Sequence, residues 1–313
     1  MDWIDRIGHR LKLPDLHIVM SVAQHRSMGK AAAQLAISQP AISKAIADVE
    51  HTLKVKLFDR TSSGVEPTPY GRALIKWGNA AFDDLRQGVK EIEHLTDPSS
   101  GELRLGCTEP MSFGFVPAIV DRLSRKYPKM SFHVTQADPA TLQARSLQSR
   151  DIELAVGRIP DALSESEFSV EILFQEPVFI ASARTNPLTR RRKVALAELI
   201  DKFWSVPPQG AIAHSVLAEA CETAKLPMPR FTVLTYSLQF HYALMASGRY
   251  LGLVPGSMLH FAKRHGLAVV PVDARLQPGP AGIVTLKNRM LSPVAQLFID
   301  TARQLAAPLR SMV

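Results

Sequence analysis

The residues from Ser38 to Lys44 carry hydrogen-bonding side chains at the start of a predicted helix. Ser38 is a candidate N-cap, and Pro40 lies in the first turn, where a missing N–H costs little. Gln39 and Ser43 are four residues apart and therefore share one helix face, with Lys44 beside them. In the major groove a Gln amide pairs with adenine, and a Ser hydroxyl bonds with donors or acceptors. The segment therefore predicts contacts to DNA bases, with phosphates held by Ser38 and the first helical amides.

Two neighbouring helices are expected to position this segment. Residues 14–23 and 28–35 show apolar side chains at helical spacing, and Ser27 is a candidate N-cap for the second. The helix that begins at Ser38 extends to about Leu53, and its apolar face is formed by Ile42, Ile46, Val49 and Leu53. Two helices joined by a three-residue turn and packed on another helix form the helix-turn-helix plan.

We call the helix from Ser38 to about Leu53 the reading helix, because it carries the predicted base contacts. A β-hairpin follows it. The sequence predicts a strand, a turn at Ser63 and Gly64, and a short return strand that stops at Pro67. Arg60 and Ser63 would place this wing on adjacent phosphates. The predicted DNA contacts are therefore Ser27, Lys30, Ser38, Gln39, Pro40, Ser43, Lys44, Arg60 and Ser63.

A long helix is predicted from Pro69, directly after Thr68. Its apolar side chains follow three- and four-residue steps, which is typical of a coiled-coil seam about 25 residues long. The seam includes Gly88, so a helix packed on its own domain stays open as the alternative. The predicted dimer contacts are Leu74, Ala81, Leu85, Ile92 and Leu95.

The remainder of the chain alternates short apolar strands with amphipathic helices. The stretch from Thr96 to Gly101, TDPSSG, indicates a linker before it. The predicted strands are 103–107, 131–136, 152–156, 178–181, 231–234, 251–254, 268–271 and 283–286. This alternation predicts an α/β unit with a mostly parallel sheet, and its length leaves room for two lobes and a cleft that binds a small molecule.

Composition excludes several classes of protein. The chain has 313 residues and is 46% hydrophobic, which is enough for two or more folding units. Cys107 and Cys221 stand far apart without a metal-ligand spacing, so neither a zinc site nor a disulfide framework is expected, and we expect no cofactor. The N-terminus lacks the apolar region of a secretory signal, and no apolar run is long enough to cross a bilayer. These features predict a cytoplasmic protein.

The net charge of +8 gives little support to DNA binding because of where it lies. Residues 1–97 hold 13 Lys and Arg against 12 Asp and Glu, whereas the remainder holds 24 against 17. The basic cluster Arg190–Lys193 contributes to this excess and is interpreted as a solvated loop or helix start. The polar pattern of the reading helix therefore carries the inference, not the overall charge.

The segment from Ser27 to Gly71, SMGKAAAQLAISQPAISKAIADVEHTLKVKLFDRTSSGVEPTPYG, resembles the winged helix-turn-helix of LysR-type transcriptional regulators. The stretch GELRLGCTEP resembles the first strand and helix of their effector domain, and ASGRYLGLVP resembles a later part of it. The motif GKAA is similar to the subgroup of galactose-binding-protein and protocatechuate-pathway regulators. The sequence differs from the family pattern at Gly29, where many members have Thr or Ser, and at Pro67, where an apolar residue is usual.

The resemblance implies a three-part organisation: a winged helix-turn-helix rich in α-helix at 1–69, a linker dimerisation helix at 70–97, and an effector-binding domain at 98–313. That domain would have the bilobal periplasmic-binding-protein-like α/β fold, with lobe I at about 98–176 and 283–313 and lobe II at about 177–282. The resemblance also implies a homodimer or homotetramer on a dyad-symmetric operator in double-stranded DNA, regulation of a promoter by a small-molecule effector, and contact with RNA polymerase.

By the same resemblance, the effector would bind between the lobes. The matching positions are Thr108, Glu109, Pro110, Met111, Ser112, Pro208, Gln209, Gly210, Ser237 and Gln239. Helix N-termini there favour an anion, whereas Glu109 opposes one and favours hydroxyls, as in a sugar, or a cationic group. Ser237 and Gln209 fit ordinary capping or turn formation equally well, and a core position is slightly favoured for Met111.

Two other classes of protein compete with a regulator. An enzyme is disfavoured because the sequence has no G-x-S-x-G, Walker, H-E-x-x-H or Rossmann motif. His214 and His241 have no neighbouring carboxylate in sequence and are interpreted as structural or solvent-facing. A solute-binding protein would share the bilobal fold, but the missing signal peptide and the N-terminal helices argue against it.

Overall fold

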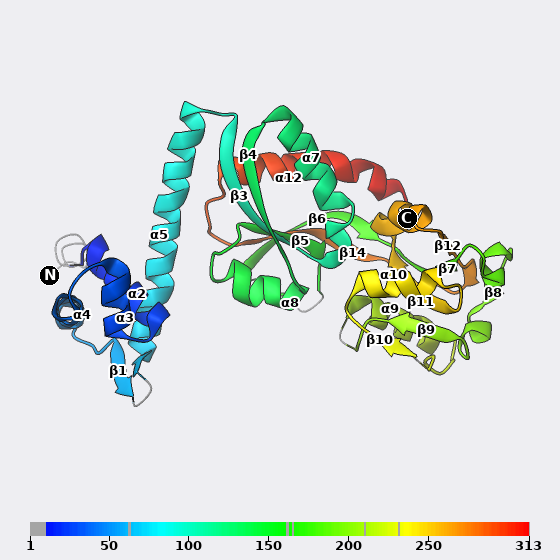
Figure 1. Cartoon of the computed structure of the whole chain (residues 1–313), viewed down its shortest axis with the longest axis horizontal. Helices are drawn as coiled ribbons and strands as arrows, with labels where there is room; N and C mark the ends of the chain where they lie inside the picture. Colours follow the sequence, from blue (N-terminus) through cyan, green and yellow to red (C-terminus); the bar gives the residue numbers. More distant parts are fainter. Residues whose placement is uncertain are drawn as a thin grey trace. The chain divides into compact units, whose positions relative to one another are not determined.

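The structure is a computed structural model that describes residues 11–61, 64–160, 163–164, 166–209, 211–230 and 232–312. It contains two compact units, residues 1–89 and 90–313, and helix α5 (Pro69–Thr96) runs from one into the other (Figure 1). The division falls within α5, between Val89 and Lys90, and not at either end of the helix.

The first unit has the predicted helices. They are α2 (Leu13–His25), α3 (Met28–Leu35) and α4 (Gln39–Leu53), followed by strands β1 (Phe58–Thr61) and β2 (Gly64–Pro67). Ser27 and Ser38 cap α3 and α4, because their hydroxyls accept the N–H of Lys30 and Ala41 at 3.3 Å. The return strand β2 includes Pro67, which pairs with Phe58, so the proline lies at the end of the hairpin without shortening it.

Burial in this unit follows the predicted apolar spacing. The shared core contains Val19, Val22, Ala31, Ala32, Ile42, Ile46, Val49, Leu57, Phe58 and Val65. Helices α2, α3 and α4 end at Arg26, Ala36 and Lys54, respectively, and each of these residues has a left-handed backbone conformation. One residue is thus enough to end each helix, which keeps the connecting turns short. Helix α5 then begins at a buried Thr68, whose hydroxyl donates to the Lys56 carbonyl at 2.7 Å.

The second unit contains two five-stranded sheets, which we call lobe I and lobe II. In lobe I the strand order is β4-β3-β5-β14-β6. These strands are β3 (Ser100–Cys107), β4 (Lys129–Gln136), β5 (Leu154–Arg158), β6 (Phe168–Glu176) and β14 (Gly279–Leu286). Helices α7 (Phe115–Lys126) and α12 (Pro293–Ala306) pack on one face, and α8 (Pro139–Thr141) with the π-turn Leu142–Leu147 lies on the other (Figure 1).

Lobe II has the strand order β10-β9-β11-β7-β12. These strands are β7 (Val178–Ala183), β9 (Phe203–Val206), β10 (Val233–Leu234), β11 (Tyr250–Pro255) and β12 (Leu267–Val269). Helix α9 (Ile212–Thr223) covers one face, and α10 (Leu238–Ala246) with α11 (Leu259–Arg264) covers the other. A small ladder joins β8 (Val194–Ala195) and β13 (Val272–Asp273), and short 3₁₀ turns lie at 187–190, 196–199, 256–258 and 307–312.

The expectation of a mostly parallel sheet was wrong. In lobe I, β3 pairs in parallel with β4 and β5, whereas β14 pairs antiparallel with β5 and β6; lobe II has the same mixture. Antiparallel pairing arises where the chain crosses from β6 to β7 and returns in β14, which begins at Gly279, ahead of the expected position 283. Strands β6 and β9 were not predicted, and Phe231 of the predicted strand 231–234 lies outside the described residues.

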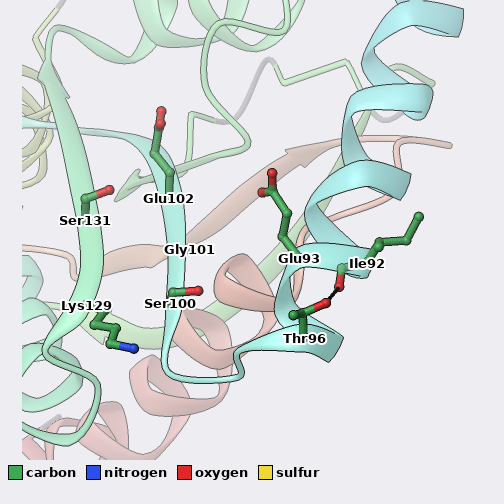
Figure 2. A pocket seen from close by; sticks show the side chains of 8 residues that line it. All are labelled: Ile92, Glu93, Thr96, Ser100, Gly101, Glu102, Lys129 and Ser131. Carbon is green, nitrogen blue, oxygen red and sulfur yellow. Dashed lines mark hydrogen bonds between the residues drawn. The ribbon is translucent and has the colours of Figure 1, made fainter.

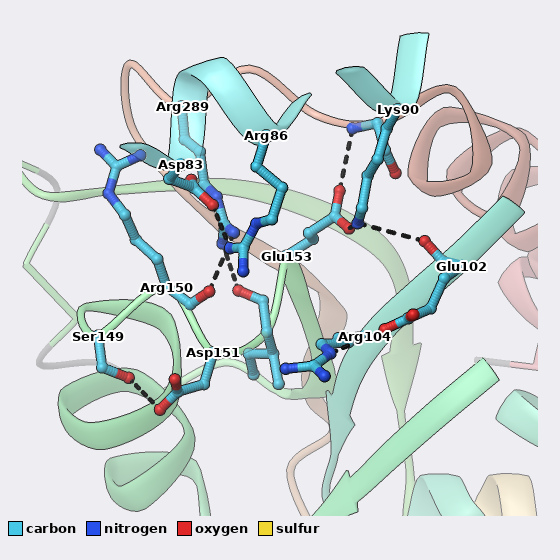
Figure 3. Close-up of polar contacts among 12 residues, drawn as sticks. Asp83, Arg86, Lys90, Glu102, Arg104, Ser149, Arg150, Asp151, Glu153 and Arg289 are labelled. Carbon is cyan, nitrogen blue, oxygen red and sulfur yellow. Dashed lines mark hydrogen bonds and ion pairs between the residues drawn. The ribbon is translucent and has the colours of Figure 1, made fainter. Parts of the chain in front are cut away.

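A buried ion pair fixes the end of α5 to lobe I. Glu153, directly before β5, is 2% exposed, and its Oε1 accepts from Lys90 Nζ at 2.7 Å (Figure 3). Its Oε2 accepts the N–H of Ser292, the N-cap of α12, at 3.0 Å, and Lys90 Nζ also donates to the Glu102 carbonyl at 3.3 Å. A buried charge pair is stable only when such additional bonds satisfy its remaining atoms. One lysine of α5 thus connects β3, β5 and α12.

Candidate nucleic-acid interface and effector cleft

The N-terminal turns of α4 present polar side chains to solvent. Gln39 and Lys44 are exposed, whereas Ile42 between them is fully buried. Ser43 is half-buried, and its hydroxyl donates to the Met28 sulfur at 3.4 Å, so it retains lone pairs to accept from a ligand. The helix rotation that buries the isoleucines therefore leaves a Gln amide and a Lys ammonium available, as predicted.

The N-termini of α3 and α4 lie close together. A Cβ placed on Gly29, in the first turn of α3, would be 3.7 Å from Gln39 Oε1. Both ends carry Ser caps, and Lys30 is exposed on the first turn of α3. Unpaired amides and the positive ends of two helix dipoles favour an anion such as a DNA phosphate. At 3.7 Å such a Cβ would make an ordinary van der Waals contact, so space alone does not require glycine at position 29.

The wing is connected to the turn between α2 and α3. Val65 N donates to the Arg26 carbonyl at 3.0 Å, and a Cβ on Gly64 would lie 2.4 Å from the same oxygen. With a φ of +131°, Gly64 also has a backbone conformation that other residues rarely adopt. Arg60 pairs with Val65 in the hairpin, and Ser63 lies outside the described residues.

In the second unit, a carboxylate of lobe I is hydrogen-bonded to a helix N-terminus of lobe II. Glu109 begins the short helix α6 (Glu109–Ser112), and its two oxygens lie 3.1 and 3.2 Å from Leu238 N, at the start of α10. Ser237 caps the same helix by accepting the N–H of Phe240 at 3.2 Å. Partial burial raises the pKa of Glu109, and the hydrogen bond from Leu238 opposes this shift. The protein's own carboxylate therefore takes an amide that an anionic ligand would need.

A second carboxylate connects the lobes at the crossover. Glu176 ends β6, is 2% exposed, and accepts the N–H of Ser257 at 2.8 Å. Gly256 N donates to the Pro177 carbonyl at 2.7 Å, and a Cβ on Gly256 would lie 2.6 Å from Pro177 Cγ. Burial raises the pKa of Glu176, and the hydrogen bonds from Ser257 and the positive charge of Arg158 act in the opposite direction. Two lobe I carboxylates thus contact lobe II backbone.

The structure brings most of the predicted cleft residues to one place. Thr108 is buried, Pro110 and Pro208 are half-buried, and Gln209, Ser237 and Gln239 are exposed. The hydroxyl of Ser112 donates to the Glu109 carbonyl at 2.7 Å, and Thr235 N donates to the Val206 carbonyl at 3.2 Å. The latter bond places the loop after β9 beside the turn into α10. Gly210 lies outside the described residues, and Met111 is packed in the lobe I core, 2% exposed.

Three residues that form contacts between the lobes were absent from the sequence prediction. Leu238, Glu176 and Ser257 meet their partners across lobes, and their sequence separations of 129 and 81 residues leave no local pattern to find them. A crevice of about 20 Å³ beside Thr108, lined also by Gly157 and Arg158, has room for about one water molecule.

A wider, open hollow of about 520 Å³ lies elsewhere in the second unit (Figure 2). The end of α5 contributes Ile92, Glu93 and Thr96, and the starts of β3 and β4 contribute the rest of its lining: Ser100, Gly101, Glu102, Lys129 and Ser131. None of the predicted cleft residues lines it, and it is therefore a surface feature distinct from the cleft.

Two family descriptions match successive parts of the chain. The bacterial regulatory helix-turn-helix protein, lysR family, matches residues 13–72, and the LysR substrate binding domain matches residues 96–307. This chain belongs to the LysR family. It is a DNA-binding transcriptional regulator with a substrate-binding domain and is not an enzyme, which excludes both competing classes of protein. Regulators of this family also form oligomers.

Individual relatives agree with this assignment. The transcriptional regulator GbpR of Azospirillum brasilense is 28% identical over 296 residues, covering 94% of this chain and 86% of GbpR. The dual regulator GltC of Bacillus subtilis is 25% identical and covers 93% of this chain and 96% of its own length.

Solved structures show the same fold. A full-length OxyR variant from Pseudomonas aeruginosa superposes with a TM-score of 0.70 at 20% identity, covering 97% of this chain and 99% of OxyR. Full-length CbnR in complex with its target DNA has a TM-score of 0.63 at 19% identity, covering 94% of this chain and 99% of CbnR. Within the described residues of this LysR protein, no helix is long and apolar enough to cross a membrane.

A buried histidine of lobe II lies on α10 and contacts strand β9. His241 is 3% exposed, its Nε2 donates to the Thr235 carbonyl at 2.8 Å, and its Nδ1 lies 2.6 Å from Ser205 Oγ. Because the carbonyl only accepts, the proton of the neutral ring is on Nε2, and Nδ1 accepts from Ser205. Burial lowers the pKa of His241, and the bond to Thr235 opposes this shift. The histidine is structural and supports the turn before Ser237.

We predict that His241 makes lobe II less stable in acid. Its pKa is lower in the folded state, so the unfolded chain binds more protons as the pH falls below about 6.5, and the free energy of unfolding decreases there. Denaturant titrations at pH 7.5 and 5.5 should show a larger decrease for the wild type than for His241→Gln. An equal decrease in both proteins contradicts the assignment.

Proposed function

We propose that Gln39 and Ser43 of α4 read the operator in the major groove, and that Lys44 beside them contacts a phosphate. The observation that carries this proposal is the exposure of Gln39 and Lys44 on a helix whose isoleucines are buried. Phosphates on either side would be held by the two helix N-termini and the wing. The contributing residues are Ser27, Lys30, Ser38, Pro40, Arg60 and Ser63.

The exposed apolar face of α5 supports dimerisation. Leu85, Ile92 and Leu95 are 51%, 66% and 76% exposed, and Trp77 and Val89 are exposed on the same helix. Large apolar side chains at such spacing are stable in water when a second helix covers them. Leu74 packs against the core of its own unit, and Ala81 has little surface to contribute, so the exposed large side chains define the seam.

We infer that the effector donates hydrogen bonds to Glu109. The amide of Leu238 is already used by Glu109, and Ser237 satisfies Phe240 N, so the start of α10 offers little to an anion. Hydroxyl groups or an ammonium group would instead bond with the carboxylate. Tyr236 and Phe240, each two positions from Leu238 in the sequence, are exposed, which favours a ligand with an apolar face.

The mechanism combines these parts. A homodimer or homotetramer, with the organisation 1–69, 70–97 and 98–313, holds a dyad-symmetric promoter site in the cytoplasm. The effector binds one arrangement of the lobes better than the other and shifts their population. Because Lys90 and Glu153 connect α5 to lobe I, the shift reaches the linker helices, which changes DNA bending and contact with RNA polymerase.

Gln39→Ala should weaken binding to the specific operator by about 1–3 kcal/mol and leave non-specific binding nearly unchanged, because an amide–base contact carries sequence information. Lys44→Ala should weaken all DNA binding and lower the salt slope by about 0.9, as expected for one lost phosphate contact. Fluorescence anisotropy at several salt concentrations measures both. If Gln39→Ala weakens every sequence equally, Gln39 does not read bases.

Leu85→Asp combined with Ile92→Asp should convert the oligomer to a smaller species, because two charges would have to be buried in the apolar seam. Size-exclusion chromatography with light scattering gives the mass. Asn79→Asp, an exposed polar position on the same helix, is the control and should keep the native mass. An unchanged mass for the double variant rules out α5 as the interface.

Sugars and cationic amino acids should raise the melting temperature of the wild type, because their hydroxyl and ammonium groups can donate hydrogen bonds to the Glu109 carboxylate. Aromatic acids should not raise it, because the same carboxylate repels an anion. A ligand at one hundred times its Kd stabilises by about 2.7 kcal/mol, so a thermal-shift panel ranks the classes. Glu109→Gln keeps the shape of the side chain and removes its charge, and it should weaken the wild-type hits. A carboxylic acid that stabilises the wild type and Glu109→Gln equally contradicts the inferred class.

A further inference from the structure

The positive charge of this chain is concentrated in lobe II. Residues 177–282 hold 12 Lys and Arg against 5 Asp and Glu, a net of +7. The two parts of lobe I, 98–176 and 283–313, hold 12 against 12, and residues 1–97 have a net of +1. The excess over neutrality therefore lies almost entirely in lobe II and not in the DNA-reading unit.

The strand registers identify one end of the lobe II sheet at which basic loops meet. Strand β7 leaves the crossover at Pro177 and ends at Ala183, and its antiparallel neighbours β11 and β12 begin opposite that far end. Strand β9 runs parallel to β11, so Phe203 and Tyr250 also lie at this end. The loops that follow β7 and precede β9, β11 and β12 are consequently neighbours.

Hydrogen bonds hold three of these loops together. Arg184 N donates to the Gly266 carbonyl at 2.9 Å, and Arg184 Nη2 donates to the Lys263 carbonyl at 3.1 Å. Asn186 Nδ2 donates to the Gly248 carbonyl at 3.0 Å, which brings the turn before β11 to the same place. Five of the exposed basic side chains on the segments that these bonds join form what we call the basic end: Arg184, Arg190 and Arg249 on the loops, and Lys263 and Arg264 in the last turn of α11.

The basic end retains its positive charge. Two carboxylates of lobe II pair with basic residues other than these five, Glu198 with Arg191 and Asp273 with Lys193. Within the part of the chain that the structure describes, no carboxylate forms an ion pair with any of the five side chains of the basic end. Guanidinium and ammonium groups without an ion-pair partner bind phosphate oxygens, and arginine does so with two parallel hydrogen bonds.

We propose that the basic end of lobe II binds the phosphate backbone of DNA outside the sequence read by α4. The near-neutral net charge of the reading unit adds little overall attraction to DNA, whereas duplex DNA presents one negative charge for about every 1.7 Å of its axis. A protein partner would be expected to use an aromatic anchor, but Phe203, which is 46% exposed at this end, already has the Arg249 guanidinium over its ring, 5.0 Å from the centroid.

The test uses the full-length protein and two operator fragments, one limited to the half-sites and one extended by about two helical turns on each side. The wild type should show a steeper salt slope on the long fragment. Arg184→Gln combined with Lys263→Gln and Arg264→Gln should bind the long fragment about tenfold more weakly, and its slope should fall by about 0.9 for each lost contact. On the short fragment the variant should match the wild type.

A matched control removes the same charge elsewhere in the effector domain. Arg145→Gln combined with Lys225→Gln and Arg275→Gln changes three exposed basic positions outside the basic end and should leave both fragments unaffected. Equal wild-type slopes on the two fragments overturn the proposal without any variant, so misfolding cannot obscure the result. An equal loss on both fragments overturns it as well. Unchanged DNA binding with reduced transcription in a purified system also overturns it and assigns the basic end to an acidic protein.

Discussion

The apolar face of α4 is removed from water by packing against α2 and α3. Ile42, Ile46 and Val49 are each at most 4% exposed, and a fully buried aliphatic side chain contributes about 1.5–3 kcal/mol. The free energy gained by burying three such side chains is larger than that of a single base contact. Their burial therefore decides how the helix is rotated about its axis. Gln39 and Lys44 are exposed as a consequence, and the DNA contacts that we propose for α4 depend on that rotation.

The two lobes are connected by a repeated chemical arrangement. Glu109 and Glu176, both from lobe I, accept backbone N–H groups from Leu238 and Ser257 of lobe II. A carboxylate removed from water is costly unless such bonds satisfy it, and burial raises the pKa of both groups. Contacts of this kind are sensitive to a ligand that competes for one of their atoms, which suits a domain whose lobes respond to an effector.

Charge and recognition are separated in this molecule. In the proposed mode of binding, the reading unit recognises DNA through neutral hydrogen-bonding groups, helix N-termini and a few lysines, whereas the net positive charge of the chain lies in lobe II. The net positive charge of the whole chain would therefore have suggested nucleic-acid binding, although that charge does not come from the reading helix. Lobe I, with equal numbers of acidic and basic residues, instead holds the end of α5 through the buried pair of Lys90 and Glu153.

The sequence by itself determined the local structure of the reading unit, because caps, apolar spacing and turn residues act within a few positions of one another. The bounds of α3 and the caps Ser27 and Ser38 followed from those signals. Only the tertiary structure decided the mixed sheets, the strands β6 and β9, and the bonds of Glu109 and Glu176 across the lobes. The two cross-lobe bonds join residues 129 and 81 positions apart, and their partners are chosen by the topology of the chain and by burial, which leave no periodic pattern in the sequence.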